Sequence, residues 1–313
     1  MQTGEFMPAD GLTRLEDFDA IYFGAIGHPD VDDSLPAKHF TFRVRKAFQQ
    51  YVNLRPIRLL PGVKGPLRDK GTGDIDFVII RENVEGEFAG VGGMVNAEQP
   101  DGLAIQTGVF TRRGIERVAH YAFKLARARR GKITNVTKSN ALPYGLVFWD
   151  RVIEEVRQFY PDAEYEKLYV DAAAMNFVLR PERFDVILTT NMFGDILSDL
   201  GGALMGSLGL APSGNINPER QFPSMFEPIH GSAPDIAGRG IANPLGTIWS
   251  GAMMLEHLGE NAAAQRILES IVAVLQDKNG PRPIDLGGQA KTVEIGDAVV
   301  QRLSCGRNLG AGG

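Results

Sequence analysis

Short apolar strand patterns alternate with amphipathic helical patterns along this chain, and this alternation decides its fold class. Segments rich in β-branched and aromatic residues have the pattern of buried parallel strands at 19–24, 74–80, 132–137, 165–170 and 184–190. Apolar residues recur at helical spacing over 113–130, 149–160, 244–258 and 262–276. The alternation predicts an α/β fold around a parallel or mixed sheet.

Length and charge narrow the classes of function. The 313 residues are more than one simple core usually needs, so we expect two lobes. The net charge of −5 argues against a nucleic-acid-binding face, and no apolar stretch approaches the roughly 18 residues of a membrane helix. The start lacks a secretory signal pattern, and the single cysteine, Cys305, suits a reducing cytosol. We therefore expect a cytoplasmic protein without a nucleic-acid or membrane partner.

Two further strand patterns, at 87–95 and 103–111, are joined by a polar turn at 99–102. This arrangement predicts a protruding β-hairpin. Because an isolated two-stranded ribbon is unstable in water, we expect a partner subunit to cover it.

Charged or polar residues follow four of the predicted strands. They are Arg81, the run Lys138-Ser139-Asn140, Asp171, and Asn191 with Asp195 and Asp199 after it. Ligands of open α/β sheets bind beyond the carboxyl ends of the strands, so these residues are candidates for a common site. The alternative for each one alone is an ordinary polar loop start, which explains the whole set less well.

Asp195 and Asp199 are four residues apart in a predicted helix, which places both carboxylates on one face. Like charges at this spacing repel, and a hard cation such as Mg²⁺ or Mn²⁺ would offset the repulsion. The alternative is a solvated acidic first turn.

Arg45, Arg55 and Arg81 form a second candidate group. Arg45 lies on an amphipathic helical pattern, and Arg55 precedes Pro56, where the chain is expected to be extended. Guanidinium groups bind carboxylates in a bidentate way, so three of them beside a metal site would suit a di- or tricarboxylic acid. Taken alone, each of these arginines is better explained as solvated, as most arginines are.

The segment 227–235 is a third candidate. Its His-Gly-Ser-Ala run, His230–Ala233, can present backbone amides to a phosphate, and Asp235 can accept from ribose hydroxyls. The chain has no G-x-G-x-x-G or Walker motif, so the residues alone favour a structural role for His230.

Longer motifs in the chain resemble the β-decarboxylating dehydrogenases, the isocitrate/isopropylmalate dehydrogenase family. The motifs are NLRP, REN-x-EG, TKSN, FDVILTTNMFGDILSD and EPIHGSAPDIAGRGIANP, and they run over nearly the whole chain. The segments GAIGHPDV, RENVEGEFAGVGG and FPSMFEPIHGSAPDI are most similar to the branch of tartrate dehydrogenase/decarboxylase and D-malate dehydrogenase. The resemblance implies NAD-dependent, divalent-metal-dependent oxidation of a 2-hydroxy dicarboxylic acid such as tartrate or D-malate, with or without decarboxylation.

The resemblance also implies a two-domain fold and roles for particular residues. The cofactor-binding domain would comprise 1–50 and 206–313, and the metal, substrate and dimerisation domain 51–205. The substrate would be held by Arg45, Arg55 and Arg81, the metal by Asp171, Asp195 and Asp199, and Lys138 would be the catalytic base. In this family the lysine and the first metal aspartate reach across a dimer interface, so Lys138 and Asp171 would serve the other protomer's active site in a homodimer.

The dinucleotide would be held by His230, Gly231, Ser232, Ala233, Asp235, Ile236, Asn243 and Asn140. Asp235 stands where NADP-using relatives have lysine, which favours NAD because a carboxylate repels a 2′-phosphate. K⁺ is an optional further cofactor in this reading.

Two departures from the family pattern bear on activity. Phe88 occupies the position of the tyrosine that usually protonates the enolate, and phenylalanine has no proton to give. We expect oxidation to survive and decarboxylation to be slowed or rerouted through water. The chain also starts later than family members do, so the first strand and helix of the family fold are expected to be missing, with lower stability and weaker activity.

Two alternatives to the tartrate/D-malate reading stay open. Isopropylmalate is the alternative substrate, and the segment 39–42 before Arg45, which resembles neither branch, would discriminate between them. The alternative of another class is a non-catalytic regulatory paralogue, which Phe88 favours and the intact set of aspartates with Lys138 opposes.

Overall fold

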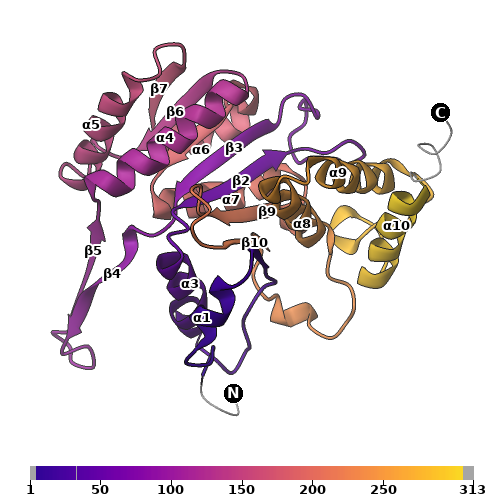
Figure 1. Ribbon diagram of the computed structural model, residues 1–313, viewed down its shortest axis with the longest axis horizontal. Coiled ribbons are helices and arrows are strands. Elements are labelled where there is room, and N and C mark those ends of the chain that lie inside the picture. The colour runs from indigo at the N-terminus through magenta and orange to yellow at the C-terminus, as the bar shows by residue number, and fades with distance from the viewer. Residues whose placement is uncertain (1–4, 33, 306–313) are drawn as a thin grey trace.

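The computed structural model describes residues 5–32 and 34–305, in which eight strands form one mixed sheet (Figure 1). The strand order across the sheet is β1-β10-β9-β2-β3-β8-β6-β7. The strands are β1 (Ala20–Tyr22), β2 (Val52–Arg58), β3 (Asp76–Glu82), β6 (Lys132–Thr137), β7 (Glu164–Tyr169), β8 (Val186–Thr189), β9 (Pro212–Ile216) and β10 (Ser224–Pro228).

Helices cover both faces of this sheet (Figure 1). The helices are α1 (Gly11–Glu16), α2 (Ser34–Pro36), α3 (Phe42–Ala47), α4 (Arg112–Ala128), α5 (Gly145–Arg157), α6 (Val170–Leu179), α7 (Asn191–Leu204), α8 (Leu245–Leu258), α9 (Asn261–Gln276) and α10 (Thr292–Cys305). A π-helical turn at Ala37–Thr41 leads into α3. Helices α4 and α8 lie on one face and α7 on the other, so the predicted α/β class is confirmed.

The parallel strands β3, β8, β6 and β7 end at one edge of the sheet. Polar residues that follow these strands in sequence are therefore brought toward that edge. Strand β2 is antiparallel to both of its neighbours, β3 and β9, so the backbone hydrogen bonding continues without a break from one half of the sheet to the other.

The core is formed where the apolar stripes of the helices meet the sheet. The predicted stripe of α4 is buried at Ile115, Val118, Ala119 and Ala122, which are 0% exposed. The Thr111 side chain caps this helix by accepting a 3.0 Å hydrogen bond from the Gly114 amide. Within the described residues, no helix combines the length and the apolar character that a membrane crossing requires.

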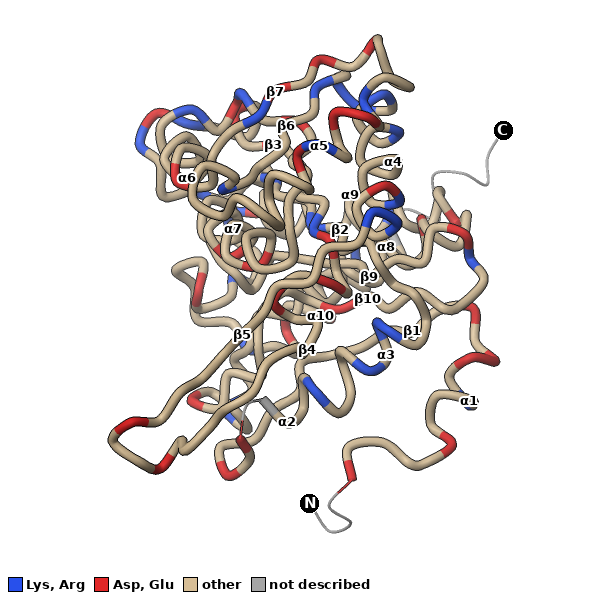
Figure 2. The backbone as a smooth tube through the Cα atoms, turned by 90° about the vertical axis from the view of Figure 1, so that its left-hand side faces the viewer, with Lys and Arg blue, Asp and Glu red and all other residues tan. Residues whose placement is uncertain are grey.

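Strands β4 (Gly86–Val95) and β5 (Leu103–Val109) form the predicted hairpin, which projects from the body of the molecule (Figure 1). Its side chains are exposed although several are apolar: Met94 is 76% and Ile105 is 56% exposed. Beyond Glu87 at the base of β4, the charged residues of the hairpin are Glu98 and Asp101 at its tip, and the rest of both strands is uncoloured in Figure 2. An exposed ribbon of this composition is typical of a surface that a second chain covers.

A buried carboxyl group stands at the root of the hairpin. Glu82, at the end of β3, is 2% exposed and accepts hydrogen bonds from the Val84 and Glu85 amides at 3.0 and 2.8 Å. Burial raises the pKa of Glu82 from 4.5 to about 7, although these two amides lower it. Between pH 4.5 and about 7 the Glu82 carboxyl therefore keeps a proton in the native state that it has released in the unfolded state.

Glu82→Gln should therefore flatten the pH dependence of stability. Between pH 4.5 and 7 the raised pKa makes the wild-type free energy of unfolding fall as pH rises, by about 2 to 3 kcal/mol. The variant should lack this component in urea unfolding at about pH 5 and about pH 8. Glu98→Gln, at the exposed hairpin tip, is the control and should keep the wild-type slope. An unchanged slope in Glu82→Gln would contradict the prediction.

Candidate active site

Three buried arginines from three different elements meet at one cavity of about 240 Å³. Arg45 comes from α3, Arg55 from β2 and Arg81 from β3, and they are 7%, 5% and 2% exposed. Phe88 and Asp195 line the same cavity. The structure thus brings together the three arginines and one of the aspartates that the sequence singled out.

Asp195 and Asn191, both on α7, hold Arg81. Arg81 Nε and Nη2 donate to Asn191 Oδ1 at 2.9 and 2.7 Å, and Nη1 donates to Asp195 Oδ1. Gly194 lies between these residues, and a Cβ there would come within 2.6 Å of the Arg81 side chain. The absence of a side chain at Gly194 therefore allows α7 to approach the Arg81 side chain closely.

Arg55 is anchored in the same cluster. Its Nη1 lies 3.2 Å from Asp195 Oδ1 and also donates to Ser198 Oγ, while Nε donates to Asn53 Oδ1 at 2.5 Å. Asp195 thereby contacts two guanidinium groups. The first turns of α7 supply both Asp195 and Ser198, as the helical spacing of these residues requires.

Arg45 belongs to a polar network that sequence reasoning missed. Its Nη2 donates to Glu227 Oε1 at 2.8 Å, and the same oxygen accepts from Asn215 Nδ2 at 2.8 Å. The Asn215 Oδ1 atom in turn accepts from Asn53 at 2.7 Å. Arg45 Nε is buried without a hydrogen-bond partner among the described residues. The cluster therefore retains a buried donor near the cavity.

The charges of the cluster act strongly on one another. Burial alone would raise the pKa of Asp195, but Arg81 and Arg55 outweigh it and hold that pKa below its usual range. Burial raises the pKa of Asp199. The Arg55 charge lowers this pKa in part, and the neighbouring Asp195 carboxylate raises it further. Burial and Arg55 lower the pKa of Arg81 to about 9. At the cavity itself three guanidinium groups face two carboxylates, Asp195 and Glu227, so the lining carries one more positive than negative charge and would attract an anion.

Phe88 lies at the root of the hairpin, on the cavity wall. Its ring meets that of Phe42 edge-on, with centroids 5.5 Å apart, and the Arg81 guanidinium carbon is 5.3 Å from the Phe88 centroid. The residue that replaces the expected tyrosine is thus directly beside the arginine cluster. Phe23, Ile26 and Phe42 extend this apolar wall.

Lys138 and Asp171 form a separate pair. Lys138 Nζ donates to Asp171 Oδ1, and this hydrogen bond holds the pKa of Asp171 below its usual range. The two side chains are 29% and 66% exposed and follow β6 and β7 respectively. Neither lines the arginine cavity. Their roles remain predictions.

The aspartates give a partial fit to a divalent metal. Asp195 and Asp199 lie one turn apart on α7 and offer the carboxylate oxygens that Mg²⁺ or Mn²⁺ prefers. Among the described residues, no group of three or more His, Cys, Asp or Glu side chains is close enough to hold a metal. Asp171 is therefore not the third ligand within its own chain.

The predicted dinucleotide loop borders the same cavity. His230 and Gly231 line it, and the His230 ring Nδ1 is 2.9 Å from the Gly231 carbonyl. Ala233 has a left-handed φ of 45°, after which Asp235 and Ile236 form a short 3₁₀ turn. Gly27 packs on this loop so closely that a Cβ would come within 2.4 Å of Ser232 Oγ.

Two other predicted cofactor residues lie apart from this loop. Asn243 is 8% exposed; its Oδ1 accepts from the Leu245 amide and its Nδ2 donates to Asp285, both at 3.0 Å. Asn140 is exposed in the turn after β6, near Lys138. The structure gives Asn243 a role at the start of α8 and leaves a cofactor role for both residues as a prediction.

Comparison with known proteins decides the family. The family model described as isocitrate/isopropylmalate dehydrogenase matches residues 1–299. The chain belongs to the isocitrate/isopropylmalate dehydrogenase family. This confirms the resemblance found in the sequence and makes the chain a member of a family of oxidoreductases.

Individual proteins that are similar to this dehydrogenase point to the same family. The D-malate dehydrogenase [decarboxylating] of Escherichia coli is 49% identical over 95% of this chain and 83% of its own length. The tartrate dehydrogenase/decarboxylase of Pseudomonas putida is 46% identical over 97% of this chain and 85% of its own. The crystal structure of isocitrate dehydrogenase from Methylococcus capsulatus superimposes with a TM-score of 0.86 at 37% identity, covering 95% of this chain and 85% of that one.

Proposed function

We propose that this dehydrogenase oxidises a 2-hydroxy dicarboxylic acid such as tartrate or D-malate, with NAD and a divalent cation, and decarboxylates the product where the substrate allows it. The observation that carries the proposal is the convergence of three buried guanidinium groups on one small cavity. A cluster of this kind is costly to bury unless carboxylates occupy it. The names of the relatives, tartrate and D-malate dehydrogenases, fit the same substrate class.

The cation and the cofactor have separate positions in the proposal. Asp195 and Asp199 would hold Mg²⁺ or Mn²⁺ together with Asp171 of a second protomer, and the His230–Ala233 loop with Asp235 and Ile236 would hold NAD, joined by Asn243 and Asn140. Residues 1–50 and 206–313 would form the cofactor domain, and 51–205 the metal and substrate domain. Asp235 is exposed, so its carboxylate would repel a 2′-phosphate and favour NAD over NADP.

A homodimer would complete the site. Lys138 and Asp171 lie outside the arginine cavity of their own chain, so they are free to serve a neighbouring one. The exposed apolar hairpin and the apolar face of α6, with Met175 52% and Leu179 58% exposed, would form the interface. The partner subunit would be a second copy of this chain.

The residues of the proposed site would have different roles in the oxidation. Arg45, Arg55 and Arg81 would bind and orient the substrate carboxylates, while Phe42 and Phe88 would exclude water from one side. Lys138 of the second protomer would take the hydroxyl proton, directly or through water. When bound, the cation supplies polarisation of the hydroxyl and ketone oxygens, and NAD supplies the hydride acceptor.

An NAD-reduction screen tests the proposal. Full-length protein would be assayed with D-malate, the tartrates and isopropylmalate, with Mn²⁺ and K⁺, against NADP and chelator controls. We expect NAD reduction with D-malate or a tartrate, loss of that activity with chelator, and recovery when Mn²⁺ is restored. Equal rates with and without the chelator would contradict the metal, and inactivity with every diacid would contradict the function.

Isopropylmalate is a second candidate substrate because of one specific observation. The cavity wall formed by Phe23, Ile26, Phe42 and Phe88 is apolar, and an alkyl substituent would bury surface against it. Faster NAD reduction with isopropylmalate than with D-malate in the same screen would favour this candidate. The non-catalytic paralogue would show no turnover with any of them.

A further inference from the structure

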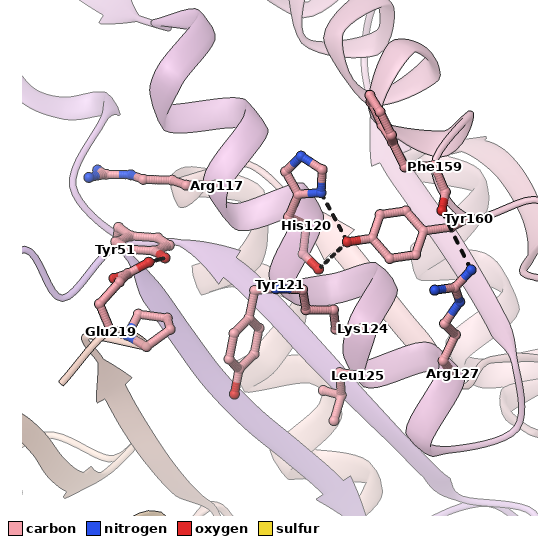
Figure 3. Close-up of a pocket in the computed structure, with 11 residues that line it drawn as sticks. Tyr51, Arg117, His120, Tyr121, Lys124, Leu125, Arg127, Phe159, Tyr160 and Glu219 are labelled. Carbon is pink, nitrogen blue, oxygen red and sulfur yellow. Dashed lines mark hydrogen bonds between the residues drawn. The ribbon is translucent and has the colours of Figure 1, made fainter.

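A second hollow in the protein lies on the face of the sheet opposite α7. This groove encloses about 1000 Å³ and lies between α4, the segment after α5 and the loop that joins β9 to β10 (Figure 3). We define the α4 groove by six of its lining residues: Tyr51, Arg117, His120, Tyr121, Lys124 and Phe159. It shares no lining residue with the arginine cavity.

Cations along α4 face this groove. Arg117, Lys124 and Arg127 recur at helical spacing, and Arg117 and Lys124 are two turns, or roughly 10 Å, apart along the helix axis. Two other arginines of α4 pair with carboxylates, Arg112 with Glu155 and Arg127 with Asp162. Arg117 and Lys124 form no ion pair with any described residue. These two positive charges are therefore available to an anion.

The Arg117 guanidinium is held in place by an aromatic ring. Its central carbon lies 4.2 Å from the centroid of the Tyr51 ring, and its Nε is buried without a hydrogen-bond partner among the described residues. The Tyr51 hydroxyl donates to Glu219 at 2.6 Å, so the one carboxylate in the groove is already engaged (Figure 3). The guanidinium is thus fixed in position before any ligand arrives.

Aromatic surface adjoins these cations. Phe159 is 70% exposed, and its ring centroid is 5.9 Å from that of His120. Burial and the neighbouring Lys124 charge lower the pKa of His120, so this ring is neutral at neutral pH. Phe159 and His120 therefore offer uncharged ring surface one turn from the Lys124 ammonium group.

We infer that the α4 groove binds a nucleoside phosphate, with its planar base against Phe159 and His120 and its phosphates on Lys124 and Arg117. The class follows from the combination of exposed ring surface with two cations in the same groove that form no ion pair with any described residue. The volume of the groove is at the upper end of the range of small-molecule sites. The site lies apart from the proposed NAD loop.

Calorimetric titration of the full-length protein tests the chemistry of the ligand. We expect ADP to bind, and adenosine and pyrophosphate, which each carry half of the recognised groups, to bind at least about tenfold more weakly. Pyrophosphate binding as tightly as ADP would overturn the assignment to a nucleoside phosphate. ADP binding no tighter than adenosine would overturn the role of the cations.

Surface variants test the location. Lys124→Gln and Phe159→Ser change exposed side chains, and each should raise the dissociation constant for ADP by about tenfold while leaving the KM for NAD unchanged. Lys278→Gln, which removes the same charge from an exposed position after α9, is the control and should bind ADP like the wild type. Wild-type ADP binding by both groove variants, or a raised KM for NAD in them, would overturn the site.

Discussion

Equimolar mixing of two inactive variants, Lys138→Met and Asp195→Asn, is expected to restore about a quarter of the wild-type activity. If Lys138 serves the second protomer's site, random assortment makes half of the dimers mixed, and each mixed dimer has one site without either substitution. Each variant alone should lose at least about 100-fold in kcat/KM, because one lacks the base and the other lacks the charge that offsets two buried arginines.

Co-expression of two differently tagged chains allows the mixed dimers to be isolated, and the isolated mixed dimers should show about half of the wild-type activity. Asp195→Asn mixed with Arg81→Met is the matched control. These two residues contact each other in one chain, so both substitutions damage the same half of the site and no activity should return. Mixed Lys138→Met/Asp195→Asn dimers that form but stay inactive would show that one chain holds the whole site.

Phe88→Tyr is expected to change the products formed from a decarboxylatable substrate such as D-malate. The ratio of CO₂ to the 2-keto diacid that is released without decarboxylation should increase by about 10²-fold or more. A general acid contributes factors of this size, and the wild-type ring has no proton to deliver to the enolate carbon. The Phe88 ring lines the cavity beside Arg81, so a hydroxyl on this ring would be within the site. NADH formation and CO₂ release would be measured on the same samples.

Phe42→Tyr is the matched control for this prediction. Phe42 packs against Phe88 edge-on and lines the same cavity, so the variant adds an equal hydroxyl to the neighbouring ring. It should leave the product ratio unchanged, since this position is not the family's acid. An unchanged ratio in Phe88→Tyr would refute the idea that the missing phenol limits decarboxylation.

The apolar strands could be predicted from sequence, and the polar ones could not. All five predicted strands are present. Strands β3, β6 and β8 are buried on both faces, whereas β1 and β7 at the two ends of the sheet are only partly buried. Strand β2 was expected only as an extended stretch at Arg55, and β9 and β10 were missed because Ser213, Asn215 and Ser224 are polar and yet at most 1% exposed. Their burial depends on partners distant in sequence, such as Asn53 for Asn215, which hydropathy does not reveal.

The residues of the candidate site also fall into those that the sequence predicts and those that it does not. Arg81, Asp171 and Asp195 were found because they follow strands whose carboxyl ends share one edge of the sheet. Ser198, Asn53 and Glu227 were not assigned to the arginine cluster. Ser198 and Glu227 contact arginines from other elements, and Asn53 accepts from Arg55 two residues along the same strand. A helical period does place Ser198 one turn from Asp195, and this signal was available in the sequence.

The antiparallel strand β2 has a mechanical consequence for the proposed lobes. It is hydrogen-bonded to β9 on one side and to β3 on the other, so the two halves of the molecule are parts of one continuous plate rather than bodies on a flexible tether. Relative movement of the halves must twist or bend that plate, which stores elastic energy and returns the plate to its resting shape. The amplitude of opening is then set by sheet stiffness rather than by the length of a linker.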